Sequence, residues 1–285
     1  MRNDSDAWPR KIGILGVGLL GGSTALAIRR ARPDTRVVGL TRNEQNAQQL
    51  LDLGVIDQTS PSVESVCESC DVVVVATPVD LIADLVVQAA EFTEPDCLIT
   101  DVGSTKAQIV NALSKQPKAE SKFVAAHPIA GSEKTGASHA TATLMEGKVI
   151  VLTPGPRTPD PVLQQAIQFW EMTGGVIQQM SAEQHDTHLA SVSHVPHLVS
   201  ALVALLPHPK ARPLVGSGWQ DITRVAAGDP GMWTAICQEN REAILDELDR
   251  FAAELVRIRE MLDDQQMEAL HAWLTKAKQL KQQSI

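Results

Sequence analysis

Apolar and polar residues alternate along the first 180 or so positions in a pattern that predicts strands separated by helices. Short apolar runs rich in β-branched residues are typical of strands buried on both faces, and the longer amphipathic stretches between them favour helices. The expected strands are Ile12–Leu15, Arg36–Leu40, Asp71–Ala76, Cys97–Thr100, Phe123–Ala126, Val149–Leu152 and Val176–Gln179. This alternation predicts an α/β fold with a doubly wound, mostly parallel sheet that binds ligands beyond the carboxyl ends of its strands.

The strand pattern stops at Ser181, and the rest of the chain reads as helices. Ala182–Leu206 predicts a largely apolar helix that Pro196 should kink. A later seam of apolar residues repeats at spacings of 4 and 3, which is typical of a packed helix pair. Its members are Ile244, Leu248, Phe251, Leu255, Ile258 and Leu262. With a last helix at Gln265–Lys281, we expect two domains, residues 1–180 and an all-helical 181–285 that forms a homodimer.

A glycine-rich turn follows the first expected strand and precedes a helix at Ser23–Arg30. It has the spacing G-x-G-x-x-G, which in this context predicts dinucleotide binding rather than an ordinary glycine turn. We expect Gly16 to allow the tight turn, Gly18 to admit the pyrophosphate and Gly21 to let the helix pack closely. The expected cofactor-binding residues here are Gly16, Gly18, Leu19, Leu20 and Gly21. The helix N-terminus favours the negative phosphates.

The end of the second strand bears on the choice of cofactor. NAD enzymes usually place an acid there for the ribose hydroxyl, whereas this chain has Thr41-Arg42-Asn43. A guanidinium favours a 2′-phosphate, so Thr41 and Arg42 predict NADP, with NAD as the alternative. A solvated turn and a hydroxyl contact from Glu44 are the competing interpretations. Thr77 and Pro78, after the third long strand, are also expected to border the cofactor.

Composition narrows the function further. The chain has 285 residues, a net charge of −9 and 44% hydrophobic residues, which favours a folded protein without a nucleic-acid partner. The densest apolar run, Leu198–Leu206, is short for a membrane span, and the N-terminus lacks an apolar signal core. We therefore expect a cytoplasmic protein that does not associate with membranes.

Cysteine and histidine spacings do not predict a metal site. Cys67 and Cys70 form a C-x-x-C without the second pair that zinc requires, so ordinary buried thiols are favoured over a redox pair. Four histidines fall within thirteen residues, but metal-binding histidines usually come with a carboxylate or thiolate, and we expect Asp186 to face away from the Val192 side of their helix. The four histidines are His185, His188, His194 and His197.

Four polar residues remain as candidates for the chemistry. Ser104 and His127 each lie just past an expected strand end. On position alone, Ser104 is also a suitable helix cap, and His127 an ordinary loop histidine. Arg224, for its part, has acidic neighbours with which it could pair on the surface. His197 lies in the apolar helix beside Pro196.

At this point the chain resembles a known family. The glycine turn, D-V-G-S-T-K, H-P-I-A-G-S-E, S-H-V-P-H and D-I-T-R-V-A occur in an order similar to that of the prephenate/arogenate dehydrogenases of tyrosine biosynthesis. The resemblance extends from about Lys11 to Leu280. It implies a Rossmann domain followed by a helical dimerisation domain. It also implies oxidative decarboxylation of prephenate or arogenate, with hydride transfer to NAD or NADP.

The resemblance also implies roles for particular residues. His127 would accept the proton of the substrate hydroxyl, with Ser104 sharing that hydrogen bond. Arg224 would bind a carboxylate, and we expect the side-chain carboxylate, because a firm hold on the departing group would slow its loss. The other expected substrate-binding residues are His197, Glu133 and Trp233.

Two other functions stay open at this point. A β-hydroxyacid dehydrogenase also joins a Rossmann domain to a helical one, but it relies on a lysine in the helical domain. A non-enzymatic NADP sensor would keep the glycine turn without needing His127, His197 and Arg224 together. The S-H-V-P-H and T-R segments favour the dehydrogenase of prephenate or arogenate, and the residues do not choose between those two substrates.

Overall fold

The computed structural model describes residues 8–41, 43–131 and 134–283. Backbone packing divides the chain into two compact units, residues 1–241 and 242–285. The strands are β1 (Lys11–Leu15), β2 (Arg36–Leu40), β3 (Gln58–Ser60), β4 (Val72–Val75), β5 (Leu98–Asp101), β6 (Phe123–Pro128), β7 (Val149–Pro154) and β8 (Val176–Gln179). The α-helices of the first unit are α1 (Leu19–Ala31), α2 (Glu44–Asp52), α3 (Val63–Cys67), α4 (Ile82–Phe92), α5 (Ala107–Leu113), α6 (Pro117–Glu120), α7 (Asp160–Glu171), α8 (Ala182–Leu189), α9 (Val195–Leu205), α10 (Ser217–Thr223) and α11 (Pro230–Glu239). The second unit is built from α12 (Arg241–Asp263) and α13 (Met267–Gln283).

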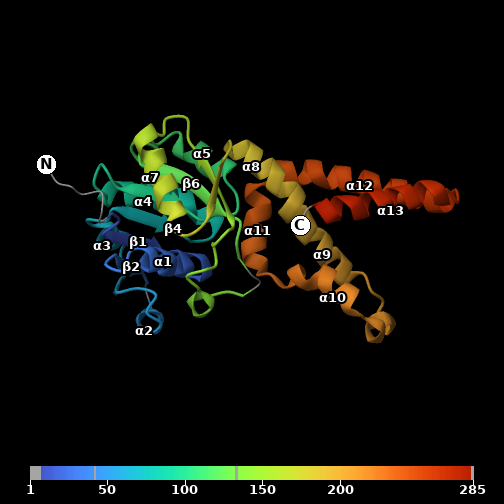
Figure 1. Ribbon diagram of the computed structural model, residues 1–285, viewed down its shortest axis with the longest axis horizontal. Helices are drawn as coiled ribbons and strands as arrows, with labels where there is room; N and C mark the ends of the chain where they lie inside the picture. Colours follow the sequence, from blue (N-terminus) through green and yellow to red (C-terminus); the bar gives the residue numbers. More distant parts are fainter. Residues whose placement is uncertain (1–7, 42, 132–133, 284–285) are drawn as a thin grey trace. The chain divides into compact units, whose positions relative to one another are not determined.

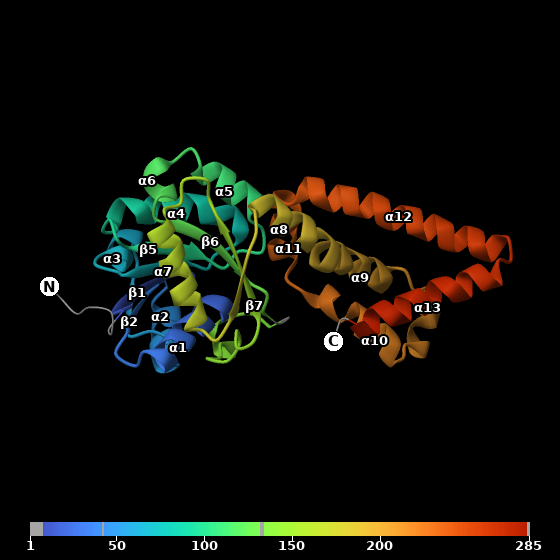
Figure 2. The same ribbon diagram turned by 45° about the horizontal axis from the view of Figure 1, so that its top comes forward.

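The eight strands form a single sheet in the order β3-β2-β1-β4-β5-β6-β7-β8. All neighbours are parallel except β6 and β7, which pair in antiparallel fashion. Helices cover both faces, as Figures 1 and 2 show. This confirms the doubly wound, mostly parallel α/β fold with helices after it.

Each face of the sheet has its own apolar core. The four valines of β4 are fully buried, because the sheet is covered on both sides. On one face α3, α4, α5 and α6 pack against the strands. On the other, α1, α2 and α7 do so, and the buried indole of Trp170 donates to Thr100 Oγ1 at 3.1 Å. The removal of this apolar surface from water is the main force that holds the strand ends in place.

Two details of the sheet differ from the sequence prediction. The short strand β3 was not expected, because Gln58–Ser60 is polar and lies at the sheet edge. Strand β6 continues through His127 to Pro128, because β7 pairs alongside it with His127 opposite Val151. His127 is therefore inside the end of a strand, and the expectation that it lies just past one was wrong.

The first segment after the sheet is one continuous helical rod from Ala182 to Leu205. Its middle turn, Ala190–His194, is a π-helix directly before Val195 and Pro196. Proline has no N–H to donate to the preceding turn, so the expected kink takes the form of a widened turn. By length and composition alone this rod could cross a membrane, which the sequence analysis did not expect. Because polar histidines interrupt its apolar runs, no single run showed this, and a bilayer core would disfavour them.

The cysteines of the C-x-x-C lie in the core beside β1. Cys67 and Cys70 are buried, and Cys70 Sγ donates to the carbonyl of Val66. Burial raises the pKa of both thiols to about 12. They stay protonated at neutral pH, which agrees with the interpretation as ordinary buried thiols.

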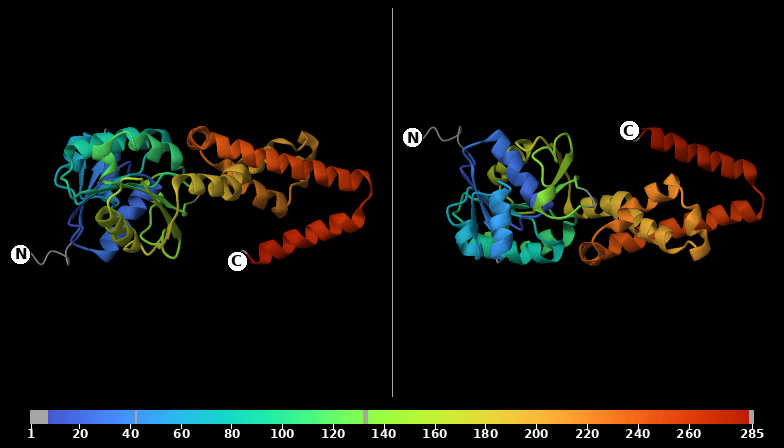
Figure 3. Two further views of the ribbon diagram at one scale, coloured as in Figure 1. Left: turned by 90° about the horizontal axis from the view of Figure 1, so that it is seen from above. Right: turned by 90° about the horizontal axis from the view of Figure 1, so that it is seen from below.

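The second unit is a helical hairpin whose arms diverge from the turn at 264–266 (Figure 3). Near the middle of the hairpin, Trp273 Nε1 donates to Glu254 Oε2 at 3.2 Å. Leu255 and Leu262 of the expected seam are 49% and 53% exposed. The seam thus runs along α12 as predicted but is only partly covered within one chain. The expected boundary near residue 180 stays a prediction, since compact packing in the first unit continues to residue 241.

Candidate active site

The glycine turn between β1 and α1 has the three properties that a dinucleotide requires. Gly16 has a φ of +102°, and a Cβ there would lie 2.5 Å from the carbonyl oxygen of Ala76. A Cβ on Gly18 would meet nothing within 4 Å, so the backbone is open to a ligand. A Cβ on Gly21 would lie 2.3 Å from the Gly16 carbonyl oxygen, which shows how closely the helix approaches. No side chain caps the start of α1 at Leu19 and Leu20, which leaves N–H groups for phosphates.

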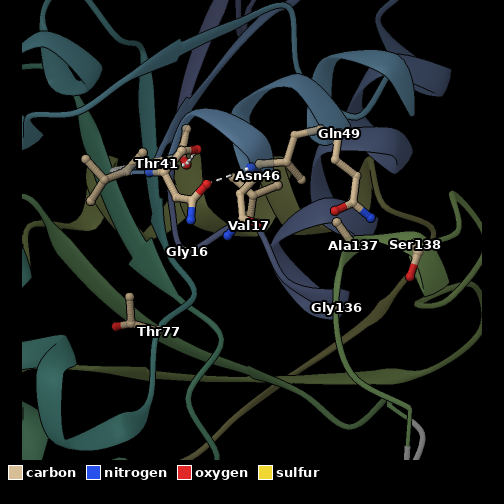
Figure 4. Close-up of a pocket in the computed structure, with 12 residues that line it drawn as sticks. Gly16, Val17, Thr41, Asn46, Gln49, Thr77, Gly136, Ala137 and Ser138 are labelled. Carbon is tan, nitrogen blue, oxygen red and sulfur yellow. Dashed lines mark hydrogen bonds between the residues drawn. The ribbon is translucent and has the colours of Figure 1, made fainter.

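A cavity of about 530 Å³ lies beside this turn (Figure 4). Gly16, Thr41 and Thr77, three of the residues predicted to bind the cofactor, line it. The hydroxyl of Thr77 is buried without a hydrogen-bond partner among the described residues, so a polar ligand would satisfy it. Pro78 follows, just before the short helix Val79–Leu81. These residues fit a nicotinamide dinucleotide.

Further residues line the cavity that the sequence analysis did not single out. Asn46 and Gln49 reach it from α2, and Asn43 caps that helix by accepting from the N–H groups of Gln45 and Asn46. Gly136–Ser138 reach it from the long β6–β7 connection, as Figure 4 shows. Residues 136–138 are far in sequence from Gly16 and Thr41, which line the same cavity, so no local pattern could have predicted that they meet there. Glu44 begins α2 outside this lining, and Arg42 lies outside the described residues.

Beyond the cofactor cavity, His127 lies at the carboxyl end of β6 and contacts a histidine of α8. His127 Nδ1 is 2.8 Å from His185 Nε2, and His185 Nδ1 is 2.7 Å from Asp186 Oδ1. Burial lowers the pKa of His127 well below its usual range, and neighbouring His185, Lys106 and His194 lower it further. His127 is therefore a neutral imidazole at physiological pH, as a proton acceptor requires.

A buried ion pair lies close enough to His127 to affect its pKa. Lys106 and Asp101 are fully buried and form a short hydrogen-bonded salt bridge. Asp101 also accepts from the N–H groups of Gly103 at 2.8 Å and Ala126 at 2.9 Å. Because Ala126 precedes His127, the pair fixes β5 and β6 where they carry their polar ends. Burial lowers the pKa of Lys106, and Asp101 opposes that change.

Ser104 follows the end of β5, the parallel neighbour of β6. It is half-buried in the connection to α5. It does not cap that helix, because Lys106 occupies the cap position and Asp186 accepts the N–H groups of Lys106 and Ala107, each at 2.8 Å. Ser104 and His127 thus come from adjacent strands at the same edge of the sheet, where doubly wound folds bind ligands.

The helical part of the first unit brings His197 and Trp233 together. Their rings stack with centroids 3.5 Å apart and planes 10° from parallel. His197 Nδ1, His194 Nε2 and Ser200 Oγ are buried without hydrogen-bond partners among the described residues. These three residues recur at every third position of one helix face, so they offer a row of polar atoms to a ligand.

Arg224 lies closer to the surface than the stacked pair. Arg224 begins a 3₁₀ turn, Arg224–Ala227, after α10, and it is exposed. Four residues later, Gly228 packs against the rings of Trp233 and His197, so this turn lies close to the stacked pair. Glu133 lies outside the described residues.

Several site residues were missed by the sequence analysis. Lys106 and Asp101 belong to a motif that was recognised, but only Ser104 was chosen from it. His185 and Asp186 were considered as metal ligands and set aside. Asn240, at the end of α11, donates from Nδ2 to the Asp186 carbonyl oxygen at 2.7 Å and to His194 Nδ1 at 3.0 Å. The adjacent pair His185-Asp186 was the visible signal in the sequence. Its partners, His127 and Lys106, are far away in the chain.

Comparison with known proteins identifies the family of this chain. Residues 24–179 match the family model "Prephenate dehydrogenase, nucleotide-binding domain", and residues 181–276 match "Prephenate dehydrogenase, dimerization domain". The chain is 34% identical to a prephenate dehydrogenase of Bacillus subtilis over 93% of this chain and 73% of that protein.

Solved structures show the same likeness. A prephenate dehydrogenase from Aquifex aeolicus, in complex with hydroxyphenyl propionate and NAD+, superposes with a TM-score of 0.90 at 32% identity, covering 97% of this chain and 98% of that one. Synechocystis arogenate dehydrogenase gives a TM-score of 0.81 at 26% identity, covering 96% and 100%. With both family models matched along nearly the whole chain, this protein belongs to the prephenate dehydrogenase family.

Proposed function

We propose that this protein is a prephenate/arogenate dehydrogenase that oxidatively decarboxylates its substrate with hydride transfer to NAD(P)+. The observation that carries the proposal is the neutral His127 imidazole, held by His185 at the carboxyl edge of the sheet that also bears the dinucleotide turn. The relatives from Bacillus subtilis and Synechocystis, named for prephenate and arogenate, support this substrate class.

The chain's own groups match the chemistry of such a substrate. Its ring hydroxyl loses a proton as the carbonyl forms, and His127 accepts that proton while Ser104 shares the hydrogen bond. Loss of CO2 then makes the ring aromatic, which drives the reaction forward. When bound, NAD(P)+ supplies the hydride acceptor. The uncapped start of α1 would hold its phosphates, and Thr77 would border it.

Substrate binding falls to the helical residues beside the sheet. Arg224 binds the side-chain carboxylate as a planar fork, and His197, stacked on Trp233, offers its unsatisfied Nδ1 to a polar group of the substrate. Glu133 completes this set. The departing ring carboxylate is left without a firm partner, because a strong contact in the ground state would raise the barrier to its loss.

NADP is the proposed preferred cofactor. Among the described residues that line the cavity, Thr41, Asn46, Gln49 and Ser138 offer neutral polar groups and none is acidic. Arg42, which follows Thr41 in the sequence, would pair with a 2′-phosphate. We also propose that the protein is cytoplasmic and forms a homodimer. The matched dimerization-domain model supports the homodimer.

Steady-state assays test the proposal directly. Reduced nicotinamide is followed by absorbance with prephenate and with arogenate, each combined with NAD+ and with NADP+. Turnover with at least one substrate is expected, and His127→Asn should lower kcat by about 10²–10⁴ while cofactor affinity stays nearly unchanged. Cofactor binding without turnover on either substrate would instead identify a sensor.

A further inference from the structure

A line of hydrogen bonds connects His127 to the backbone of a distant loop. His127 Nδ1 contacts His185 Nε2 at 2.8 Å, and His185 Nδ1 contacts Asp186 Oδ1 at 2.7 Å. Asp186 in turn accepts from the backbone N–H groups of Lys106, at Oδ1, and Ala107, at Oδ2, each at 2.8 Å. The line therefore joins β6, α8 and the start of α5.

The direction of each bond follows from the two backbone groups at its end. A backbone N–H can only donate, so both oxygens of Asp186 act as acceptors, and the carboxylate form satisfies both donors. His185 Nδ1 must then carry the proton that it shares with Asp186. In a neutral imidazole this leaves His185 Nε2 as an acceptor. His127 must donate from Nδ1, and its Nε2 is the unprotonated nitrogen.

Rigid surroundings keep this arrangement in place. His185 and Asp186 are almost fully buried, and Asn240 fixes the Asp186 carbonyl oxygen from the end of α11. The two histidine rings meet edge to face, with planes 61° apart. Neither ring can turn over without breaking one of these hydrogen bonds.

We infer that His185 and Asp186 are positioning residues that hold His127 in the tautomer with a bare Nε2, the nitrogen that takes the substrate proton. The inference rests on the proposed role of His127 as the proton acceptor. Asp186 acts at a distance of two hydrogen bonds, as the carboxylate of a catalytic triad acts on its histidine.

The same line also accommodates the charge that forms on His127. Once Nε2 is protonated, Nδ1 still donates to His185, whose own proton is held by the Asp186 carboxylate. The other titratable groups that face His127 are Lys106, paired with Asp101, and His194 of the π turn. Burial, His185, Lys106 and His194 all disfavour a positive charge on His127. The Asp186 carboxylate, bonded to His185, is the negative group on this line that can offset it.

Asp186→Asn is the first test variant. The amide oxygen can keep the bonds from Lys106 N–H and His185 Nδ1, but its NH₂ then faces the N–H of Ala107, and the variant carries no negative charge. The positive charge that forms on His127 would then have no carboxylate at the end of the line to offset it. We expect kcat to fall by about 100-fold or more with KM within about threefold of wild type, because substrate contacts are unchanged. Glu183→Gln, an exposed carboxylate of the same helix, is the matched control.

A second pair of variants covers the case in which Asp186→Asn fails to fold. His185→Gln keeps an oxygen that can accept from His127 Nδ1, whereas His185→Leu removes the acceptor. We expect the glutamine variant to retain at least about ten times the kcat of the leucine variant. His188→Asn, exposed on the same helix, should match wild type. Equal loss in both His185 variants would point to a purely structural role and overturn the inference.

The deciding measurement is the tautomer itself, read from the ¹⁵N chemical shifts of labelled histidine rings. The His127 signal is identified by its loss in His127→Asn. At neutral pH wild type should show Nδ1 protonated, and His185→Leu, which removes the acceptor for Nδ1, should show the proton moved to Nε2. A wild-type His127 with its proton on Nε2 would refute the inference. Wild-type kcat in His127→Asn would refute the proposed role of His127 instead, so the two failures are distinguishable.

Discussion

The imidazole of His197 stacks on the indole of Trp233 with ring centroids 3.5 Å apart, and Gly228 packs against both rings. A Cβ on Gly228 would lie 2.5 Å from Trp233 Nε1 and 3.2 Å from His197 Cε1. The backbone of Gly228 has a φ of −62°, which any residue can adopt, so space alone requires glycine here. The pair is thus held from α9, from α11 and from the turn that follows Arg224.

Gly228→Ala should therefore weaken substrate binding without harming the fold. The added methyl group would push the indole off the imidazole, and we expect KM to rise about tenfold with kcat changed little. Gly218→Ala is the matched control, because a Cβ there would meet nothing within 4 Å. Unchanged KM in Gly228→Ala, with the variant folded, would show that the stacked pair does not line the substrate site.

The choice of cofactor gives a second prediction. Arg42→Ala should weaken binding of NADP selectively, by about 1–3 kcal/mol, because a charge-assisted bond to the 2′-phosphate is lost. The kcat/KM of the wild type should be higher with NADP than with NAD. Arg36→Ala, an exposed arginine at the start of β2, serves as the control. An equal loss for both cofactors in Arg42→Ala would contradict the assignment.

The sequence predicted those features that depend on residues close together in the chain. The β-branched run at Val72–Val75 and the glycine turn depend on neighbours within a few residues, so their pattern is visible in sequence. The partners of His127 are different, because His185 lies 58 residues away and joins β6 only after the sheet and α8 have packed. Likewise, Asp186 caps α5 by accepting the N–H of Ala107, which lies 79 residues away in the chain. The sequence around Ala107 does not predict this contact.

The buried histidines predict that acid destabilises the fold. Burial lowers the pKa of His194 to about 4, and Asn240 donates to its Nδ1, so a proton there would meet a donor. Between pH 6.5 and 4 the unfolded chain binds this proton and the folded chain does not, so stability falls as pH falls. The loss from His194 alone is on the order of 3 kcal/mol by pH 4.

The measurement is the unfolding free energy across that pH range. His194→Gln should show a shallower decline than wild type, since one fewer buried histidine titrates. His188→Asn removes an exposed histidine of the same rod and should keep the wild-type slope. A His194→Gln slope as steep as that of wild type would show that other groups govern the acid sensitivity.

Arg224 gives a prediction for substrate affinity. The substrate carries two carboxylates and the protein has a net charge of −9, so a cation is needed where the substrate binds. Arg224→Ala should raise KM by an amount equivalent to about 2–4 kcal/mol, because the carboxylate would lose its partner. Arg224→Lys should recover little, since an ammonium does not reproduce the fork.

The kinetic pattern of that variant also tells which carboxylate is bound. A change mainly in KM indicates the side-chain carboxylate, whose contact is the same in the ground and transition states. A fall in kcat alone would assign Arg224 to the departing ring carboxylate. Arg212→Ala, another exposed arginine of the helical segment, should leave both constants near wild type.

The exposed part of the α12 seam predicts that the active species is a homodimer. Leu255 and Leu262, one heptad apart, remain 49% and 53% exposed within one chain. Surface of this kind is normally covered by a second copy in a symmetric interface.

Placing a charge on this seam should be costly, since glutamates at Leu255 and Leu262 would be desolvated without partners. We expect light scattering to find a dimer for wild type and a monomer for Leu255→Glu combined with Leu262→Glu, whereas the exposed off-seam change Arg259→Gln should leave the dimer intact. A wild-type protein that is monomeric and fully active at micromolar concentration would show that the seam serves another purpose.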